Sequence, residues 1–166
     1  MPKNRYDCRW MVKRDMPEVL EIEAGSFAAP WSMEDFLEAL RERNCIGMVV
    51  DRDDVILGFM LYQLEKDHLL LLNMAVCPDH RLRGVGKAMV AKLRSKLSGH
   101  RRTHILADVN ERNLEAQLFF KAEGFLATDT LRRHYPSGDD AYRFEFTHMQ
   151  ATNPFDFSSE DSCRGR

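Results

Sequence analysis

The sequence has few cysteines and few clustered histidines, the residues that form disulfide bonds and structural metal sites. Its four cysteines, at positions 8, 45, 77 and 163, form no Cys-x-x-Cys pair. This spacing excludes the common zinc and dithiol motifs and is too sparse for a disulfide framework. We therefore expect free thiols in a reducing compartment. His100 and His104 are four residues apart, but Gly99 interrupts the helical pattern just before them, so we expect no metal ion.

Long hydrophobic runs and an excess of one charge are missing as well. Apolar runs such as residues 69–72 are far shorter than the roughly 20 residues that cross a bilayer. The N-terminal segment lacks the apolar core of a signal peptide. A net formal charge of -2 argues against general nucleic-acid binding, which usually requires a basic surface. The basic stretch at 92–102 fits a solvated helix end. We expect a cytoplasmic protein with neither a membrane nor a nucleic acid as partner.

The composition is that of one globular domain. The chain has 166 residues, of which 44% are hydrophobic and 30% charged, enough for a core without staples. We assign residues 1–149 to this domain. Residues 150–166 are polar and without periodicity, which predicts a disordered C-terminal tail.

Apolar spacing predicts a mixed order of strands and helices. Strands are predicted at 5–13, 45–51, 54–64, 69–76, 103–109, 126–134 and 141–146. Helices are predicted at 15–27, 32–43, 86–98 and 113–125, the second opened by a capping box of Ser32 and Asp35. The order β-α-α-β-β-β-α-β-α-β-β indicates an α/β fold with a mixed sheet and helices on its faces, rather than alternating βαβ units.

Two glycines separated by one residue, Gly84 and Gly86, lie between a predicted strand and a predicted helix. Backbone amides gathered at a helix start suit a phosphate. A P-loop would need glycine at position 81 and Ser or Thr after Lys87, and the chain has Arg81 and Ala88 there.

A dinucleotide fingerprint is the second possibility for this glycine pair. It would need a third glycine where the chain has Met89, although Asp108 lies at about the spacing of a ribose-binding acid. The antiparallel strands predicted upstream do not belong in that fold, so this alternative is the weaker one.

The third pattern, Arg-x-x-Gly-x-Gly at residues 81–86, resembles the coenzyme A pyrophosphate loop of the GNAT acetyltransferases. Glycines allow close approach to the phosphates, and a helix that begins near Val85 presents unpaired N–H groups. Further segments resemble the branch of this family that acetylates the N-terminal alanine of a ribosomal protein: 30–36, 73–76, 107–110, 113–116, 124–125 and 133–136. The resemblance extends over residues 7–149.

The resemblance implies a GNAT fold with acetyl-CoA as the cosubstrate. The central, mostly antiparallel sheet would splay between strands 4 and 5, and pantetheine would lie in the gap. The residues implied at the cofactor are Met74, Ala75 and Val76 for the pantetheine backbone pairing, Arg81, Leu82, Arg83, Gly84, Val85, Gly86, Lys87 and Ala88 for the pyrophosphate, Asn113 for the pantetheine arm, and Phe120 beside the thioester.

The same resemblance implies direct transfer of the acetyl group to a free α-amine. Asp108 would act as the general base, at a position where the branch has Glu. Phe120 occupies the position of the family's acidic Tyr and has no hydroxyl, so Tyr135 is the nearest substitute for the acid. Phe27, Pro30 and Trp31 would line the acceptor groove, with Tyr135 on the opposite wall.

Three functions therefore stay open. The first is acetylation of a protein or peptide N-terminus by a monomer or weak dimer. The second is acetylation of a small-molecule amine by the same fold. The third is a CoA-binding regulatory module with weakened catalysis, which the missing hydroxyl at Phe120 keeps possible.

Overall fold

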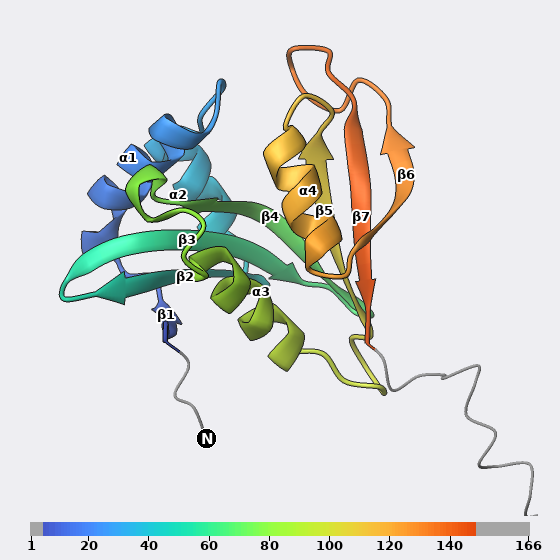
Figure 1. Cartoon of the computed structure of the whole chain (residues 1–166), viewed down its shortest axis with the longest axis horizontal. Coiled ribbons are helices and arrows are strands. Elements are labelled where there is room, and N and C mark those ends of the chain that lie inside the picture. Colours follow the sequence, from blue (N-terminus) through green and yellow to red (C-terminus); the bar gives the residue numbers. More distant parts are fainter. Residues whose placement is uncertain (1–4, 149–166) are drawn as a thin grey trace, which may run out of the picture.

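The computed structural model describes residues 5–148 and contains one seven-stranded sheet with helices on both faces (Figure 1). The strands are β1 (Cys8–Trp10), β2 (Cys45–Arg52), β3 (Val55–Leu64), β4 (His68–Val76), β5 (His104–Asn110), β6 (Leu126–Leu131) and β7 (Ala141–Thr147). The helices are α1 (Met16–Ser26), α2 (Met33–Arg41), α3 (Val85–Ser95) and α4 (Leu114–Ala122). The predicted order of strands and helices is confirmed. The predicted tail lies outside the described residues.

Local signals set the start of α2 and the end of α4. Ser32 and Asp35 form the predicted capping box, in which Asp35 N donates to Ser32 Oγ (3.2 Å) and Ser32 N donates to Asp35 Oδ2 (2.8 Å). Gly124 follows α4 with a φ of 89°, as a helix C-terminus favours. No described helix is both long and apolar enough to span a membrane.

Three predicted boundaries were clearly wrong. The strand predicted at 126–134 ends at Leu131. The first strand has three residues instead of nine, because Asp15 accepts from Val12 N and turns the chain into a short 3₁₀ segment. Helix α3 ends at Ser95, before Gly99, because the chain tightens there: Lys96 N donates to Leu93 O (3.0 Å).

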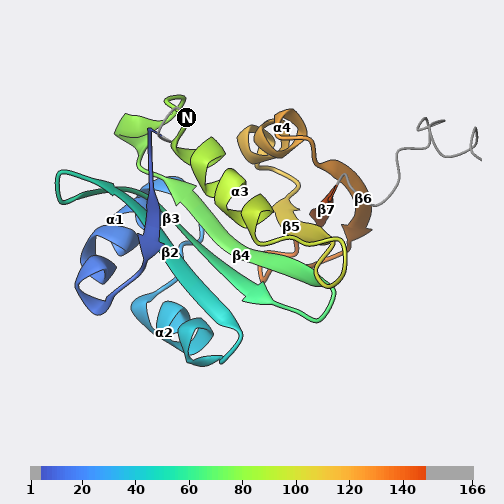
Figure 2. The same ribbon diagram turned by 90° about the horizontal axis from the view of Figure 1, so that it is seen from below.

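The sheet order is β1-β2-β3-β4-β5-β7-β6, and only the β4–β5 pair is parallel. Helices α1 and α2 cover one face of β1–β4, whereas α3 and α4 lie on the opposite face (Figure 2). Each face has its own core. Phe36 of α2 and Phe59 of β3 are fully buried where α1 and α2 meet the sheet, and Met89 and Leu93 of α3 are fully buried where α3 meets its opposite face. The predicted antiparallel run of β2, β3 and β4 is confirmed.

A bulge in β4 determines where this strand leaves β5. Leu61 of β3 is opposite Asn73, while its neighbour Tyr62 is opposite Leu71, so Leu72 is the extra residue. The bulge reverses the direction of the side chains that follow. Leu71 packs into the core on the side of α3 and α4, whereas Asn73, two residues further on, bonds to Glu23 of α1 on the opposite face.

The parallel ladder stops at the same place. β4 and β5 pair from His68–His104 to Leu71–Ala107 and no further. Figure 1 shows the two strands diverging beyond that point. The predicted splay between strands 4 and 5 is therefore present.

Gly58 of β3 gives a direct test of how closely α3 packs on the sheet. A methyl group on this residue would lie 3.0 Å from the Ala75 carbonyl oxygen and 3.1 Å from Val85 Cγ1. The backbone oxygen cannot rotate away, so we expect Gly58→Ala to lower the free energy of unfolding by about 1–3 kcal/mol. Urea denaturation measures this change.

Gly99→Ala is the matched control, because a methyl group there would meet nothing within 4 Å. We expect its free energy of unfolding to stay within about 0.5 kcal/mol of the parent. Equal stability of both variants would show that α3 does not rest tightly on β3.

Candidate functional site

The loop predicted to hold a phosphate joins β4 to α3. After a short 3₁₀ turn, Pro78–His80, both Leu82 (φ 61°) and Gly84 (φ 94°) adopt left-handed backbone. Gly84 is the N-cap residue of α3 and supplies no side-chain hydrogen bond to the helix. The first N–H groups of α3, from Val85 onward, therefore have no partner within the helix and can bind an anion.

Three cationic side chains of this loop differ in their contacts. Arg81 anchors the loop, because its Nε donates to Val76 O (3.2 Å) and its Nη2 donates to Ser26 Oγ (3.0 Å) at the end of α1. Arg83 and Lys87 are exposed beside the helix start. They are the cations best placed to meet a phosphate from solution.

Gly86 lets α4 approach the start of α3. A methyl group on Gly86 would lie 3.1 Å from Phe119 Cε2 and 3.7 Å from Val76 Cγ2. The ring of Phe119 therefore lies against the phosphate loop and the end of β4. Sequence reasoning assigned no role to Phe119, and nothing in the local pattern distinguishes it from the neighbouring Phe120.

Beyond the bulge, β4 has one open edge. Met74, Ala75 and Val76 pair with β3, and no other strand in the described part of the chain pairs with their second edge. Extended backbone with unpaired N–H and C=O groups can accept a linear, amide-containing ligand as an added strand. The pantetheine arm of coenzyme A is such a ligand, so these three residues fit the predicted contact.

Two other predicted cofactor residues lie at α4 and are used by the fold itself. Asn113 is the N-cap of α4, and its Oδ1 accepts from Ala116 N (3.2 Å). Phe120 is 5% exposed, and its ring lies 5.1 Å from that of Phe125 and 6.2 Å from that of Phe144. Their contacts with a cofactor stay predictions.

Asp108 lies on β5 just beyond the end of the parallel ladder. Its neighbours Ala107 and Val109 are in the core beneath α3 and α4, so its side chain points to the opposite face of the sheet. Both carboxylate oxygens accept hydrogen bonds from Arg143 on β7, at 2.8 Å from Nε and 3.0 Å from Nη2. This hydrogen bonding raises the pKa of Arg143. Asp108 therefore belongs to a partly buried ion pair.

Tyr135 approaches Asp108 from the loop between β6 and β7. Its hydroxyl donates to the backbone carbonyl of Asp108 at 3.4 Å. Burial, followed by the charge of Asp108, raises the pKa of the phenol above its usual value of 10.0. The phenol therefore keeps its proton at neutral pH and is able to donate it.

The predicted acceptor residues lie at and beyond the end of α1. Phe27 and Trp31 are partly buried against the core beneath α1 and α2, and the Trp31 ring lies 5.3 Å from Phe36. Pro30 is exposed. The two aromatic side chains pin this segment to the core, which is compatible with their lining a groove on their outer side.

A buried polar pair beside this segment escaped the sequence analysis. Glu23 of α1 is 1% exposed; its Oε1 accepts from Trp31 N and its Oε2 accepts from Asn73 Nδ2, both at 2.9 Å. Asn73 reaches Glu23 because the bulge turns it toward α1. The sequence did contain a sign of this pair, because Glu23 falls on the same helical face as the buried Val19 and Ile22.

Comparisons with known proteins agree with this geometry. The model of the acetyltransferase (GNAT) family matches residues 16–125. The [ribosomal protein bS18]-alanine N-acetyltransferase of Salmonella typhimurium is 28% identical over 123 residues, which cover 74% of this chain and 82% of that protein.

Solved structures show the same fold. The ribosomal-protein-S18-alanine N-acetyltransferase from Escherichia coli superposes with a TM-score of 0.76 at 23% identity, covering 89% of this chain and 97% of that one. Arabidopsis thaliana NAA60 in complex with acetyl-CoA superposes with a TM-score of 0.72 at 17% identity, covering 86% and 98%. The predicted fold class is confirmed.

The buried carboxyl of Glu23 predicts a pH dependence of stability. Burial raises its pKa above the usual 4.5, so the folded state holds this proton at pH values where the unfolded state has lost it. Stability must then fall as pH rises from about 4.5 through the folded-state pKa. Glu23→Gln removes this titration, and Asn73 can turn its amide to accept from the new side chain. We expect the variant to gain stability relative to the parent as pH rises.

Urea denaturation of both proteins between pH 4 and 8 measures this difference. Subtracting one curve from the other cancels the titration of all groups that the two proteins share. A difference that stays constant over this range would contradict a raised pKa at Glu23.

Proposed function

The chain belongs to the GNAT family of acetyltransferases, which use acetyl-CoA, and we propose that it acetylates the α-amine at the N-terminus of a protein or peptide. One observation carries the proposal: the open edge of β4 leads through the loop at 77–84 to the start of α3, which no side chain caps, with Asp108 on the strand across the gap. The names of the relatives support the choice of acceptor, because the Salmonella enzyme is described as acting on an alanine of a ribosomal protein.

The chemistry of the acceptor favours an α-amine over a lysine side chain. Only the neutral amine attacks a carbonyl carbon. An α-amine has a pKa near ~8 and a lysine near ~10.4, so deprotonating lysine at the same pH costs about 3.4 kcal/mol more. A modest proton acceptor therefore suffices for an N-terminus.

The cofactor-binding part of the proposal assigns the pyrophosphate to the loop and the first turn of α3, residues 81–88. Arg83 and Lys87 neutralise its charge while Arg81 holds the loop on β4 and α1. Met74, Ala75 and Val76 pair with pantetheine through their backbone. Asn113 and Phe120 complete this part of the site from α4. The bound acetyl-CoA supplies the thioester that the amine attacks.

Asp108 and Tyr135 are proposed to move the protons. Asp108 takes the amine proton, directly or through one water, while Arg143 fixes the carboxylate on β5. Tyr135 gives its phenolic proton to the departing thiolate. The Tyr135 hydroxyl lies 3.4 Å from the Asp108 carbonyl, so it is close to the proposed base. Phe120 has no hydroxyl and cannot take this role.

Phe27, Pro30 and Trp31 are proposed to form the wall of the acceptor groove opposite Tyr135. Glu23 holds the Trp31 backbone and Asn73 in place. Because Glu23 has both oxygens hydrogen-bonded and is buried, we assign it a positioning role. A peptide that enters here would reach the open edge of β4 with its N-terminus first.

The first test measures release of free thiol from acetyl-CoA with a set of acceptors. We expect turnover with an Ala-initiated peptide and none with the same peptide after chemical acetylation of its N-terminus. An N-blocked peptide with an internal lysine should also be inactive. Turnover only with small amines would indicate that the acceptor is a small molecule and not a peptide. Binding of acetyl-CoA without any turnover would indicate a regulatory module.

Two lysines of α3 make a matched pair in the same assay. Lys87 lies in the first turn and Lys96 at the C-cap, and both are exposed. If the pyrophosphate binds at the helix start, Lys87→Ala raises the KM for acetyl-CoA about tenfold, and Lys96→Ala leaves it unchanged. Equal effects would contradict the assigned phosphate site.

The role of Asp108 is tested against that of its partner. As a general base, Asp108→Asn should lower kcat/KM by roughly 10²–10⁴-fold. Arg143→Gln breaks the same ion pair but leaves the carboxylate, so it should keep most of the activity. Melting temperatures show whether both variants fold. An equal loss of activity in both would mean that the pair acts only by joining β5 to β7.

A further inference from the structure

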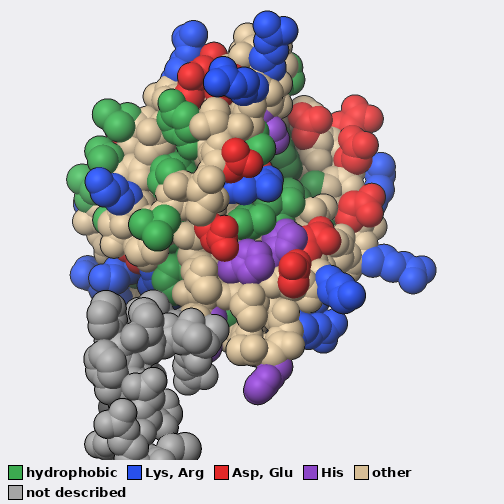
Figure 3. Space-filling view, turned by 90° about the vertical axis from the view of Figure 1, so that its right-hand side faces the viewer, with side chains coloured by type: hydrophobic (Ala, Val, Ile, Leu, Met, Phe, Trp, Pro, Cys, Tyr) green, Lys and Arg blue, Asp and Glu red, His purple; other side chains and the backbone are tan. Residues whose placement is uncertain are grey.

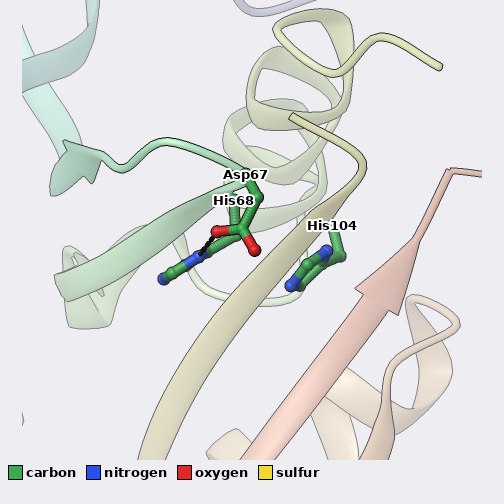
Figure 4. A group of neighbouring side chains, drawn as sticks. All are labelled: Asp67, His68 and His104. Carbon is green, nitrogen blue, oxygen red and sulfur yellow. Dashed lines mark hydrogen bonds and ion pairs between the residues drawn. The ribbon is translucent and has the colours of Figure 1, made fainter. Parts of the chain in front are cut away.

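A second group of functional side chains lies at the opposite end of the β4–β5 pair from the splay. His68 and His104 form the first in-register pair of the parallel ladder, and their rings are stacked with centroids 5.4 Å apart. Asp67 directly precedes β4. One ring nitrogen of each histidine and one carboxylate oxygen of Asp67 lie within 4.8 Å of one another (Figure 4).

We propose that Asp67, His68 and His104 bind one divalent transition-metal ion of the zinc type, with water as the remaining ligand. Two imidazoles and one carboxylate are a donor set that Zn²⁺ accepts in tetrahedral geometry. Hard ions such as Mg²⁺ prefer oxygen ligands and should not bind here. The proposal concerns residues outside the acetyl-transfer site and does not depend on the proposed function.

The distances suit such an ion after small side-chain movements. Zinc–nitrogen bonds of about 2.0–2.1 Å place tetrahedral donors roughly 3.3 Å apart. His68 Nδ1 and Asp67 Oδ1 are 2.7 Å apart and need only separate slightly. Because all the ligand atoms lie within 4.8 Å of one another, no pair has to close by more than about 1.5 Å. Rotation about side-chain bonds provides this movement.

The backbone beneath these side chains is already fixed. Thr103 N donates to Asp67 O at 3.0 Å, which joins the two chain segments just before their strands pair. The ladder then holds His68 opposite His104. Folding has therefore already brought the three ligand residues together, so the ion has to order only their side chains.

The protons and the access route are compatible with binding. The hydrogen bond to Asp67 requires a proton on His68 Nδ1, and an ion bound at this nitrogen takes the place of that proton. The Asp67 side chain is 70% exposed and that of His68 is 23% exposed, so an ion reaches them from solvent. Figure 3 shows histidine side chains at the surface of this side of the molecule, next to acidic ones.

Binding would link the two halves of the sheet at their junction. β4 belongs to the half with β1–β3, and β5 to the half with β7 and β6. An ion on His68 and His104 bridges the first pair of a ladder that has only four. We therefore expect the ion to raise thermal stability and to leave acetyl transfer at the splayed end unchanged.

The test uses tag-free, full-length protein that has been stripped with EDTA and dialysed. Calorimetric titration with ZnCl2 should give one ion per chain, and MgCl2 should give no binding. At ~100 times the dissociation constant, Zn²⁺ should raise the melting temperature by roughly 5–10 °C. EDTA should reverse the shift.

Variants then locate the ion. His68→Asn combined with His104→Asn should abolish both the heat and the shift. His100→Asn, an exposed histidine in the loop before β5, is the matched control and should bind like the parent. Asp67→Asn should weaken binding by about tenfold or more.

Two results would overturn the proposal. One is the absence of saturable Zn²⁺ binding to the parent protein. The other is unchanged Zn²⁺ affinity in the double variant, which would place the ion elsewhere, for example on cysteine thiols. If the double variant melts in EDTA well below the parent, the single variant His68→Gln is used instead. Unchanged Zn²⁺ affinity in that folded variant would also overturn the proposal.

Discussion

The short parallel contact between β4 and β5 is the constraint on which the rest of the molecule depends. Four residue pairs join the two halves of the sheet, and a one-residue bulge at Leu72 ends the contact. Without the extra residue, Asn73 would face α3 and could not meet Glu23. The same displacement frees one edge of β4 directly before the loop that opens α3. A single added residue thus sets the open edge of β4, its approach to α3 and the bond of Asn73 to Glu23 on α1.

Two carboxylates flank this opening in contrasting surroundings. Glu23 is buried, receives two hydrogen bonds from neutral groups and has a raised pKa. Asp108 is less enclosed and receives both of its side-chain hydrogen bonds from a guanidinium. The first suits a group that holds backbone segments in place. Asp108, in contrast, is paired with a charged side chain and lies closer to solvent, where an incoming amine would arrive.

The structural features that depend on residues close together in the sequence could be predicted from the sequence. The capping box at Ser32, the turn at Gly124 and the glycine turn that opens α3 each depend on a few neighbouring residues, and they were found from the sequence. The splay and the site residues came from family resemblance instead. The Glu23–Asn73 bond and the Asp108–Arg143 pair were not found, because each joins segments that only tertiary folding brings together. For the same reason, helical spacing paired His104 with His100, whereas strand register pairs it with His68.

The bonds of Arg81 extend the influence of the phosphate loop beyond the loop itself. This one side chain joins the last carbonyl of β4 to the hydroxyl of Ser26, the residue before the aromatic segment that begins at Phe27. An anion that draws the guanidinium toward itself must lengthen or break the bond to Ser26. Occupancy of the loop and the position of the segment at Phe27 would then be thermodynamically linked, and such a linkage works equally in both directions. Such a linkage would let one ligand alter the affinity for another without any movement of the sheet.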